Sequence, residues 1–248
     1  MEKELYERAV SEAQDRYYPI LAKLYEDKKD SALRWKNSML TRYAAFVIGG
    51  VARNGKDQWI DFMNEKDQFA AIESSIDPVK DIAKLIAMYE ESKMGDSTLR
   101  LEMDAKTDDY RELLFQLKKA WIALDDGPNR ITMSRVWEHR LVAETTHNKN
   151  ERTKCCFIHV REPDEIKKWL TRLEDSGFIC ASVCVRGHMS KDNYQNHCEQ
   201  QTLDYDYDIY VENTGGLDQL RADAYGFRLA YLKAFGYVTY PNPYRDLL

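Results

Sequence analysis

The sequence has no long hydrophobic run and no excess of positive charge. No apolar stretch approaches the roughly 20 residues that a helix needs to cross a bilayer, and the acidic N-terminus, Met1-Glu2-Lys3-Glu4, is unlike a signal peptide. The formal net charge is −6, which argues against a protein that coats nucleic acid by electrostatic attraction. We therefore expect a cytoplasmic protein with neither a membrane nor a nucleic-acid partner.

Cysteine is also scarce. The five cysteines are an odd number and lie mostly in apolar, strand-like segments, which predicts reduced thiols in a protein core. Cys184, His188, His197 and Cys198 have the side chains of a zinc site, but their spacing matches no strong zinc motif. Cys184 therefore reads as a core residue, together with Cys180 on the same strand face. No Ser-His-Asp or Cys-His arrangement with supporting context indicates nucleophilic catalysis.

What the chain does contain is enough material for a globular fold. Its 248 residues are 31% charged and 44% hydrophobic, as in soluble globular proteins. This length can bury one sizeable core, or one core with a smaller helical appendage.

The most informative stretch is Ala44–Asp57, in which an apolar run ends in two glycines. The spacing Gly50-x-x-x-x-Gly55-Lys56 is that of a phosphate-binding loop, except that Asp57 stands where Ser or Thr is expected. Glycines let such a loop curl with its N–H groups inward, and the next helix turns its positive end to the same hollow. The Lys56 ammonium can then follow the terminal phosphate. An ordinary strand-to-helix turn is the alternative.

Hydrophobic periodicity predicts strands and helices in alternation. Residues 1 to about 40 form a predicted helical extension in which Pro19 indicates a break or kink. After the strand that precedes Gly50, the predicted strands are 69–76, 155–160, 178–185 and 206–212. The first predicted helix after Gly50 begins at Gln58, and the later ones cover about 79–91, 107–124, 130–143, 164–175 and 217–234. Asp77 is the predicted N-cap of the helix at 79–91, and a loop is predicted over 94–103. Strands that are apolar on both faces and joined by helices indicate a parallel sheet in a three-layer α/β fold.

Four separated segments, in this order, resemble the P-loop nucleoside monophosphate kinases, and most closely the phage-type deoxynucleoside monophosphate kinase branch. They are Gly50–Asp57, Asp77–Lys80, Val160–Glu165 and Leu203–Gly215. The likeness covers about residues 43 to 234, and the branch also carries Asp directly after the loop lysine. The resemblance implies a P-loop NTPase fold that transfers the γ-phosphoryl group of ATP to a (deoxy)nucleoside monophosphate, with Mg²⁺.

The resemblance also implies a domain plan. A helical extension at 1–40 would precede a kinase-like α/β domain at 41–248. Within that domain, about 78–145 would be a helical insertion that binds the nucleoside monophosphate, and about 186–204 a lid. The sequence leaves open whether the protein is a homodimer.

The same resemblance assigns roles to individual residues. The donor phosphates of ATP would be held by Gly50, Arg53, Asn54, Gly55, Lys56 and Asp57, with Asp57 also a metal ligand. The acceptor phosphate would be bound by Lys80, Arg111 and Arg161. The catalytic cations would be Lys56, Arg161 and Arg186, where Arg186 and Lys191 begin the lid. For Arg161 a salt bridge with Glu162 is the alternative, and for Lys80 and Arg111 it is a solvated charge on a helix.

Two departures from the family pattern motivate a second hypothesis. Gln58 stands where these kinases usually have Thr or Ser, and His159 stands where many have an Asp. An imidazole cannot replace a carboxylate at a hard cation. The alternative is a catalytically impaired nucleotide-binding protein of the same fold that works as a sensor or interaction module. A kinase acting on modified bases in DNA is a third reading, which the acidic charge disfavours.

One further cluster has two readings. Asp204, Asp206 and Asp208 occupy alternate positions at the start of a predicted strand. They could be metal ligands or simply solvated residues at the strand start. The interleaved tyrosines, Tyr205, Tyr207 and Tyr210, could stack on a base or pack the sheet against helices.

Overall fold

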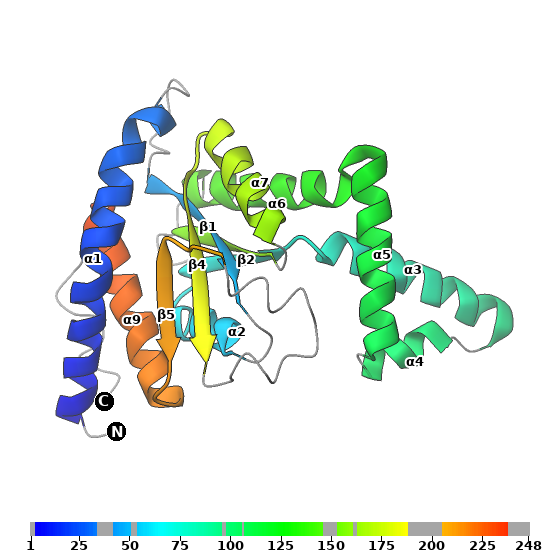
Figure 1. Cartoon of the computed structure of the whole chain (residues 1–248), viewed down its shortest axis with the longest axis horizontal. Helices are drawn as coiled ribbons and strands as arrows, with labels where there is room; N and C mark the ends of the chain where they lie inside the picture. Colours follow the sequence, from blue (N-terminus) through cyan, green and yellow to red (C-terminus); the bar gives the residue numbers. More distant parts are fainter. Residues whose placement is uncertain are drawn as a thin grey trace. The chain divides into compact units, whose positions relative to one another are not determined.

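The computed structural model describes residues 3–33, 42–50, 54–95, 98–105, 107–145, 153–160, 163–187 and 205–237. These residues fall into two compact units (Figure 1). The first contains the described residues up to Ile72 and those from His139 onward, and the second runs from Glu73 to Glu138. In the described part of the chain, no helix combines the length and the apolar character that crossing a membrane requires.

The first unit is built on a five-stranded parallel sheet of order β2-β3-β1-β4-β5. The strands are β1 (Ala44–Gly49), β2 (Ala70–Ser74), β3 (Cys155–His159), β4 (Ile179–Gly187) and β5 (Ile209–Asn213). All six residues of β1 are buried, as expected for a strand covered on both faces. The prediction of an α/β fold with a central parallel sheet is therefore confirmed.

Helices cover both faces of this sheet. On one face, α2 (Lys56–Met63) and α9 (Leu217–Ala234) pack together with α1 (Lys3–Leu33), which contacts both α9 and β4. On the other face, the strongly amphipathic helix α7 (Pro163–Asp175) contacts β1 and β4 (Figure 1). This is the arrangement that right-handed crossovers on the two sides of a central strand produce.

The core on the α2 and α9 face is largely aromatic. Phe46 and Phe157 of neighbouring strands stack with ring centroids 5.2 Å apart, and Trp59 of α2 and Phe227 of α9 meet at 5.0 Å. Such ring pairs add stabilisation beyond the area that they bury. The packing fixes α2, and with it the loop that precedes it, against the sheet.

Helix α1 continues through Pro19 without interruption, so the predicted break is wrong. Its buried face, Ala13, Tyr17 and Leu21, belongs to the same core as the sheet. At the crossing with α9, a Cβ on Gly226 would stand 2.4 Å from that of Ala13. The two helix backbones therefore approach closely at this crossing.

The second unit is helical. It contains α3 (Asp77–Met94), α4 (Thr98–Ala105), α5 (Asp108–Asp125) and the first part of α6 (Gly127–Thr145). Its core is formed by Val79, Ala83, Tyr110 and Leu114, with Leu99 and Met103 of α4 packed against it. The predicted loop over 94–103 is therefore wrong after residue 97. The predicted Asp77 N-cap is also wrong by one position, because Ile76 is the N-cap and Asp77 the first helical residue.

Candidate functional site

The candidate site lies where the connections of the sheet diverge. From β1 the chain passes through α2 to β2 on one side, whereas β3 leads through α7 to β4 on the other side of β1. In open α/β sheets, ligands bind outside the carboxyl ends of the strands at such a switch point. The loop after β1 starts at this position.

Glycines shape both described ends of that loop. Gly50 has φ 116° and Gly55 has φ 85°, a region that L-residues rarely adopt. A Cβ on Gly50 would stand 2.9 Å from the carbonyl oxygen of Val185 in β4. Gly55 is also the N-cap of α2, and no side chain caps this end of the helix. The first turn of α2 therefore presents backbone N–H groups that an anion can satisfy.

Lys56 folds back over this loop. Its Nζ donates a hydrogen bond of 3.1 Å to the carbonyl oxygen of Gly50, six residues earlier. The ammonium thus lies across the opening between the two ends of the loop. A phosphate placed there would accept hydrogen bonds from this mobile ammonium.

Asp57 and His159 meet beside the loop. His159 ends β3, and its Nδ1 lies 3.5 Å from Oδ1 of Asp57 in the first turn of α2. The side chain of Asp57 is 79% exposed. A carboxylate in the first turn of a helix interacts favourably with the positive end of the helix dipole. The predicted metal ligand and His159, one of the two departures from the family pattern, are therefore neighbours.

The structure places Arg186 in β4, which continues to Gly187, instead of in an open segment. Its register partner is Glu212 of β5, whose Oε1 lies 3.6 Å from Nη1. The guanidinium carbon sits 3.8 Å from the ring centroid of Tyr210. Strand pairing extends further than the apolar run predicted, because an ion pair and a cation–π contact replace hydrophobic burial at the strand end.

The remaining predicted phosphate ligands fall in the second unit or outside the described residues. In the second unit, Lys80 forms a 2.6 Å ion pair with Asp77, and Arg111 lies on the exposed side of α5. Arg161, Arg53 and Lys191 lie outside the described residues, so their roles stay predictions. The loop ends and Lys56 are the part of the predicted site that the first unit brings together.

The cysteines of the described ranges are core residues, as the sequence indicates. Cys155, Cys156, Cys180 and Cys184 are buried thiols. Burial raises the pKa of Cys184 to about 11 and that of Cys180 to about 12, which keeps both thiols protonated near neutral pH. The other members of the zinc hypothesis, residues 188, 197 and 198, lie outside the described residues. Within the described ranges, no group of three or more His, Cys, Asp or Glu side chains could hold a metal ion.

The acidic cluster before β5 has a structural use in its last member. Oδ2 of Asp208 accepts hydrogen bonds from the backbone N–H of Ser182 at 2.7 Å and from its hydroxyl at 2.8 Å. Asp208 therefore joins β4 to the start of β5, at a distance from the carboxyl edge of the sheet. Asp206 is exposed, and Asp204 lies outside the described residues.

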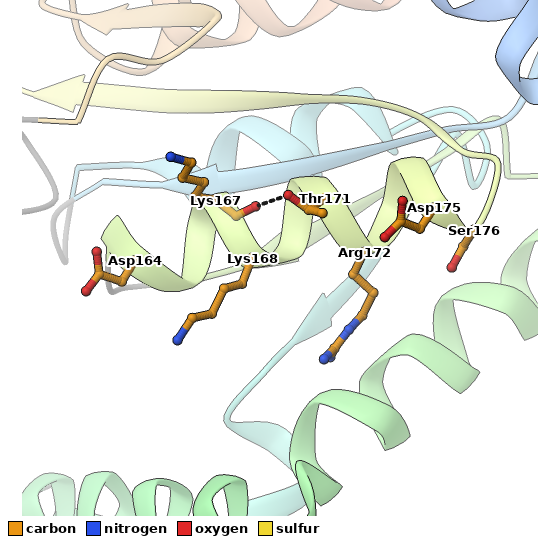
Figure 2. Close-up of a pocket in the computed structure, with 7 residues that line it drawn as sticks. All are labelled: Asp164, Lys167, Lys168, Thr171, Arg172, Asp175 and Ser176. Carbon is orange, nitrogen blue, oxygen red and sulfur yellow. Dashed lines mark hydrogen bonds between the residues drawn. The ribbon is translucent and has the colours of Figure 1, made fainter.

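An open hollow runs along the outer side of α7 (Figure 2). It is lined by Asp164, Lys167, Lys168, Thr171, Arg172, Asp175 and Ser176. Lys168 and Arg172 extend on the same side of the helix, and the Thr171 hydroxyl bonds to the carbonyl of Lys167 at 3.1 Å. Cations lie here between a carboxylate at each end, and none of the predicted site residues takes part. The hollow is a solvated helix face.

Three residues shape the site in ways that the sequence did not predict. Tyr207, expected only to stack on a base or to pack the sheet against helices, packs against Gly49, where a Cβ would stand 2.0 Å from the phenolic oxygen. Asn213 bonds to the loop at Asn54, and Asp223 is a buried carboxylate beneath α2. Only Asp223 left a usable signal, because a carboxylate between two alanines on an apolar helix face is unusual.

Comparison with known proteins leaves the family open: no protein-family model matches the chain, and no curated protein matches it. The functional conclusion therefore depends on the geometry of the loop and on the chemistry of its residues.

Proposed function

We propose that this protein is a nucleotide kinase that transfers the γ-phosphoryl group of ATP to a (deoxy)nucleoside monophosphate. The observation that carries the proposal is the Lys56 ammonium lying over a glycine-bounded loop, at the carboxyl end of the central strand of a parallel sheet. Phosphoryl transfer requires mainly positioning and positive charge around the phosphate oxygens, and this loop supplies both.

The donor phosphates would bind at the start of α2. Backbone N–H groups around Asn54 and Gly55 would face the β- and γ-phosphates, since no side chain caps the helix. Lys56 would exchange its hydrogen bond with Gly50 for one with a phosphate oxygen. In that exchange the acceptor changes from a neutral carbonyl to an anionic phosphate oxygen, so that both partners of the hydrogen bond carry a charge.

Magnesium fits these residues. Mg²⁺ is usually held by one or two carboxylates together with substrate phosphates and water, and Asp57 offers an exposed carboxylate one residue after Lys56. When bound, the ion would neutralise charge that develops on the phosphates. The acceptor phosphate would be bound by Lys80, Arg111 and Arg161, with Arg186 as a further cation.

The direct test is to incubate the purified protein with ATP, Mg²⁺ and each natural nucleoside or deoxynucleoside monophosphate, and to measure diphosphate by ion-exchange chromatography. We expect one or a few monophosphates to be converted by wild type and not by Lys56→Met. Absence of product with every monophosphate would remove the kinase proposal.

A nucleotide-binding protein without efficient turnover is the second candidate. It is favoured by His159, which stands within ion-pair distance of the one predicted metal ligand. In this case ATP would raise the melting temperature by mass action, while no monophosphate would yield a diphosphate. A melting temperature unmoved by ATP would contradict both candidates.

A further inference from the structure

Asn54 is enclosed by the last residues of two neighbouring strands. Gly187 ends β4 and Asn213 ends β5, and the two are register partners. A Cβ on Gly187 would stand 2.6 Å from Oδ1 of Asn54, while the side-chain amide of Asn213 donates a 3.1 Å hydrogen bond to the Asn54 carbonyl. Asn54 is 3% exposed. The residue before the N-cap of α2 is thus docked on the β4–β5 edge.

The contact from Asn213 acts on a particular peptide. In a planar trans peptide the C=O and N–H groups point in opposite directions. Because Asn213 binds the carbonyl of Asn54, the N–H of Gly55 is directed away from Asn213. Gly55 adopts φ 85°, and glycine populates positive and negative φ about equally readily. The hydrogen bond from Asn213 therefore helps to select the peptide orientation at this position.

The space around Gly55 makes the contact specific. A Cβ there would stand 2.7 Å from Nδ2 of Asn213 and 3.0 Å from Cδ2 of Leu220. The amide of Asn213 consequently lies directly on the backbone that leads into Lys56. A shorter side chain at 213 would not reach the carbonyl.

We propose that Asn213 is a positioning residue for the phosphate loop: through the Asn54 carbonyl it orients the Gly55 peptide that would face the triphosphate. The inference rests on the proposed phosphate-binding function. Asn213 lies 159 positions after Asn54 in the sequence. It predicts that Asn213 governs the affinity for phosphates and leaves the affinity for the acceptor nucleotide unchanged.

The test measures tripolyphosphate and ATP binding by isothermal titration calorimetry on the full chain. Asn213→Ala removes the donor, and Asn213→Asp keeps the shape but places a carboxylate against the Asn54 carbonyl. Thr214→Asp is the matched control, because this exposed neighbour adds the same charge without contacting the loop in the described structure. Unliganded melting curves establish that each variant is folded.

We expect Asn213→Ala to weaken tripolyphosphate and ATP binding by about 5- to 20-fold, and Asn213→Asp to weaken it further. In turnover, KM for ATP should rise by a similar factor while KM for the acceptor stays unchanged, a split that a purely structural role would not produce. Affinities of Asn213→Ala within about two-fold of wild type would overturn the inference. Equal losses in Asn213→Ala and Thr214→Asp would overturn it as well.

The two proposals fail in different ways. If wild type binds neither tripolyphosphate nor ATP, the proposed function is wrong, and the inference falls with it. If wild type binds both and Asn213→Ala binds them equally well, the phosphate site stands and Asn213 has no part in positioning it.

Discussion

Trp59 of α2 donates a hydrogen bond from its indole Nε1 to Oδ1 of Asp223 in α9, over 3.0 Å. The same carboxylate accepts a 2.8 Å bond from the Tyr17 hydroxyl and an ion pair from Arg16, both on α1. Asp223 is 2% exposed, so three helices share one buried charge. The helix that follows the phosphate loop is therefore tied to α1 and α9 through a single carboxyl group.

Removing this carboxylate should destabilise the first unit strongly. Asp223→Ala leaves Trp59, Tyr17 and Arg16 without their shared acceptor, and breaking a buried charged network costs about 3–5 kcal/mol. We expect the urea midpoint of unfolding, followed by tryptophan fluorescence, to fall accordingly. Asp218→Ala, in the first turn of the same helix and exposed, is the control, and an equal loss in both variants would contradict the prediction.

The same carboxylate should give the stability a defined pH dependence. Burial is the largest influence on Asp223 and raises its pKa above the usual value, although Arg16 opposes the shift. The folded protein therefore binds this proton at a higher pH than the unfolded chain does, and the free energy of unfolding increases as pH falls through the raised pKa. The gain ends near the unfolded pKa of about 3.9.

Urea unfolding of wild type and Asp223→Asn across mildly acidic pH measures this effect. The difference in free energy between the two proteins should grow in favour of wild type as the pH is lowered toward that limit. A difference that stays constant, or that shrinks with acidification, would contradict the raised pKa.

Gly49 should tolerate no side chain. A Cβ at this position would stand 2.0 Å from the hydroxyl and 2.8 Å from Cζ of Tyr207, which is itself buried. Gly49→Ala should lower the free energy of unfolding by about 1–3 kcal/mol, as overpacking of a core does. The double variant Gly49→Ala with Tyr207→Leu should recover part of the loss. If thermal melts show no recovery of stability in the double variant, the clash with Tyr207 is not the cause of the loss.

Lys56 should matter for ligand binding and little for stability. Lys56→Met removes the cation at the loop, so we expect an ATP affinity about 10- to 100-fold lower. Because Lys56 is only partly buried, we expect an unliganded melting temperature close to that of wild type. Lys66→Met, after the end of α2, is the control for the loss of charge. Isothermal titration calorimetry compares the three proteins, and equal affinities in wild type and Lys56→Met would exclude the loop as the phosphate site.

Asp57 should set the magnesium requirement. We expect Asp57→Asn to raise the Mg²⁺ concentration for half-maximal turnover by at least about ten-fold, with EDTA abolishing product in both proteins. Because its side chain is exposed, the substitution should leave the melting temperature nearly unchanged. An unaltered Mg²⁺ titration would show that phosphates and water alone hold the ion.

The sheet was predictable because each strand carries its own local signal. Runs such as Cys155–Val160 are apolar on both faces, which only a strand covered on both sides requires. The start of β5 was not predictable from such a pattern. The sequence alternates from Asp206, yet the strand begins at Ile209, since Asp208 bonds to Ser182 of β4 and the Tyr207 N–H bonds to the Tyr210 hydroxyl.

Helix α4 was missed for a similar reason. Gly95, Asp96 and Ser97 are strong loop formers, and they conceal the spacing of Leu99 and Met103, which pack on a core formed by the two flanking helices, α3 and α5. In the candidate site, too, some residues could be predicted from local sequence and others could not. Lys56 and its glycines lie within seven residues and have a recognisable spacing, whereas Asn213 reaches the loop only through the fold.

The contact between α1 and α9 also bears on how the chain acquires its fold. Arg16 and its partner Asp223 are 207 residues apart, so α1 emerges from the ribosome long before the helix that buries its apolar face exists. Closing so long a loop is entropically unfavourable until late contacts reward it. Helix α1 is consequently secured late, and nascent chains must keep its hydrophobic stripe from foreign surfaces until α9 has been synthesised.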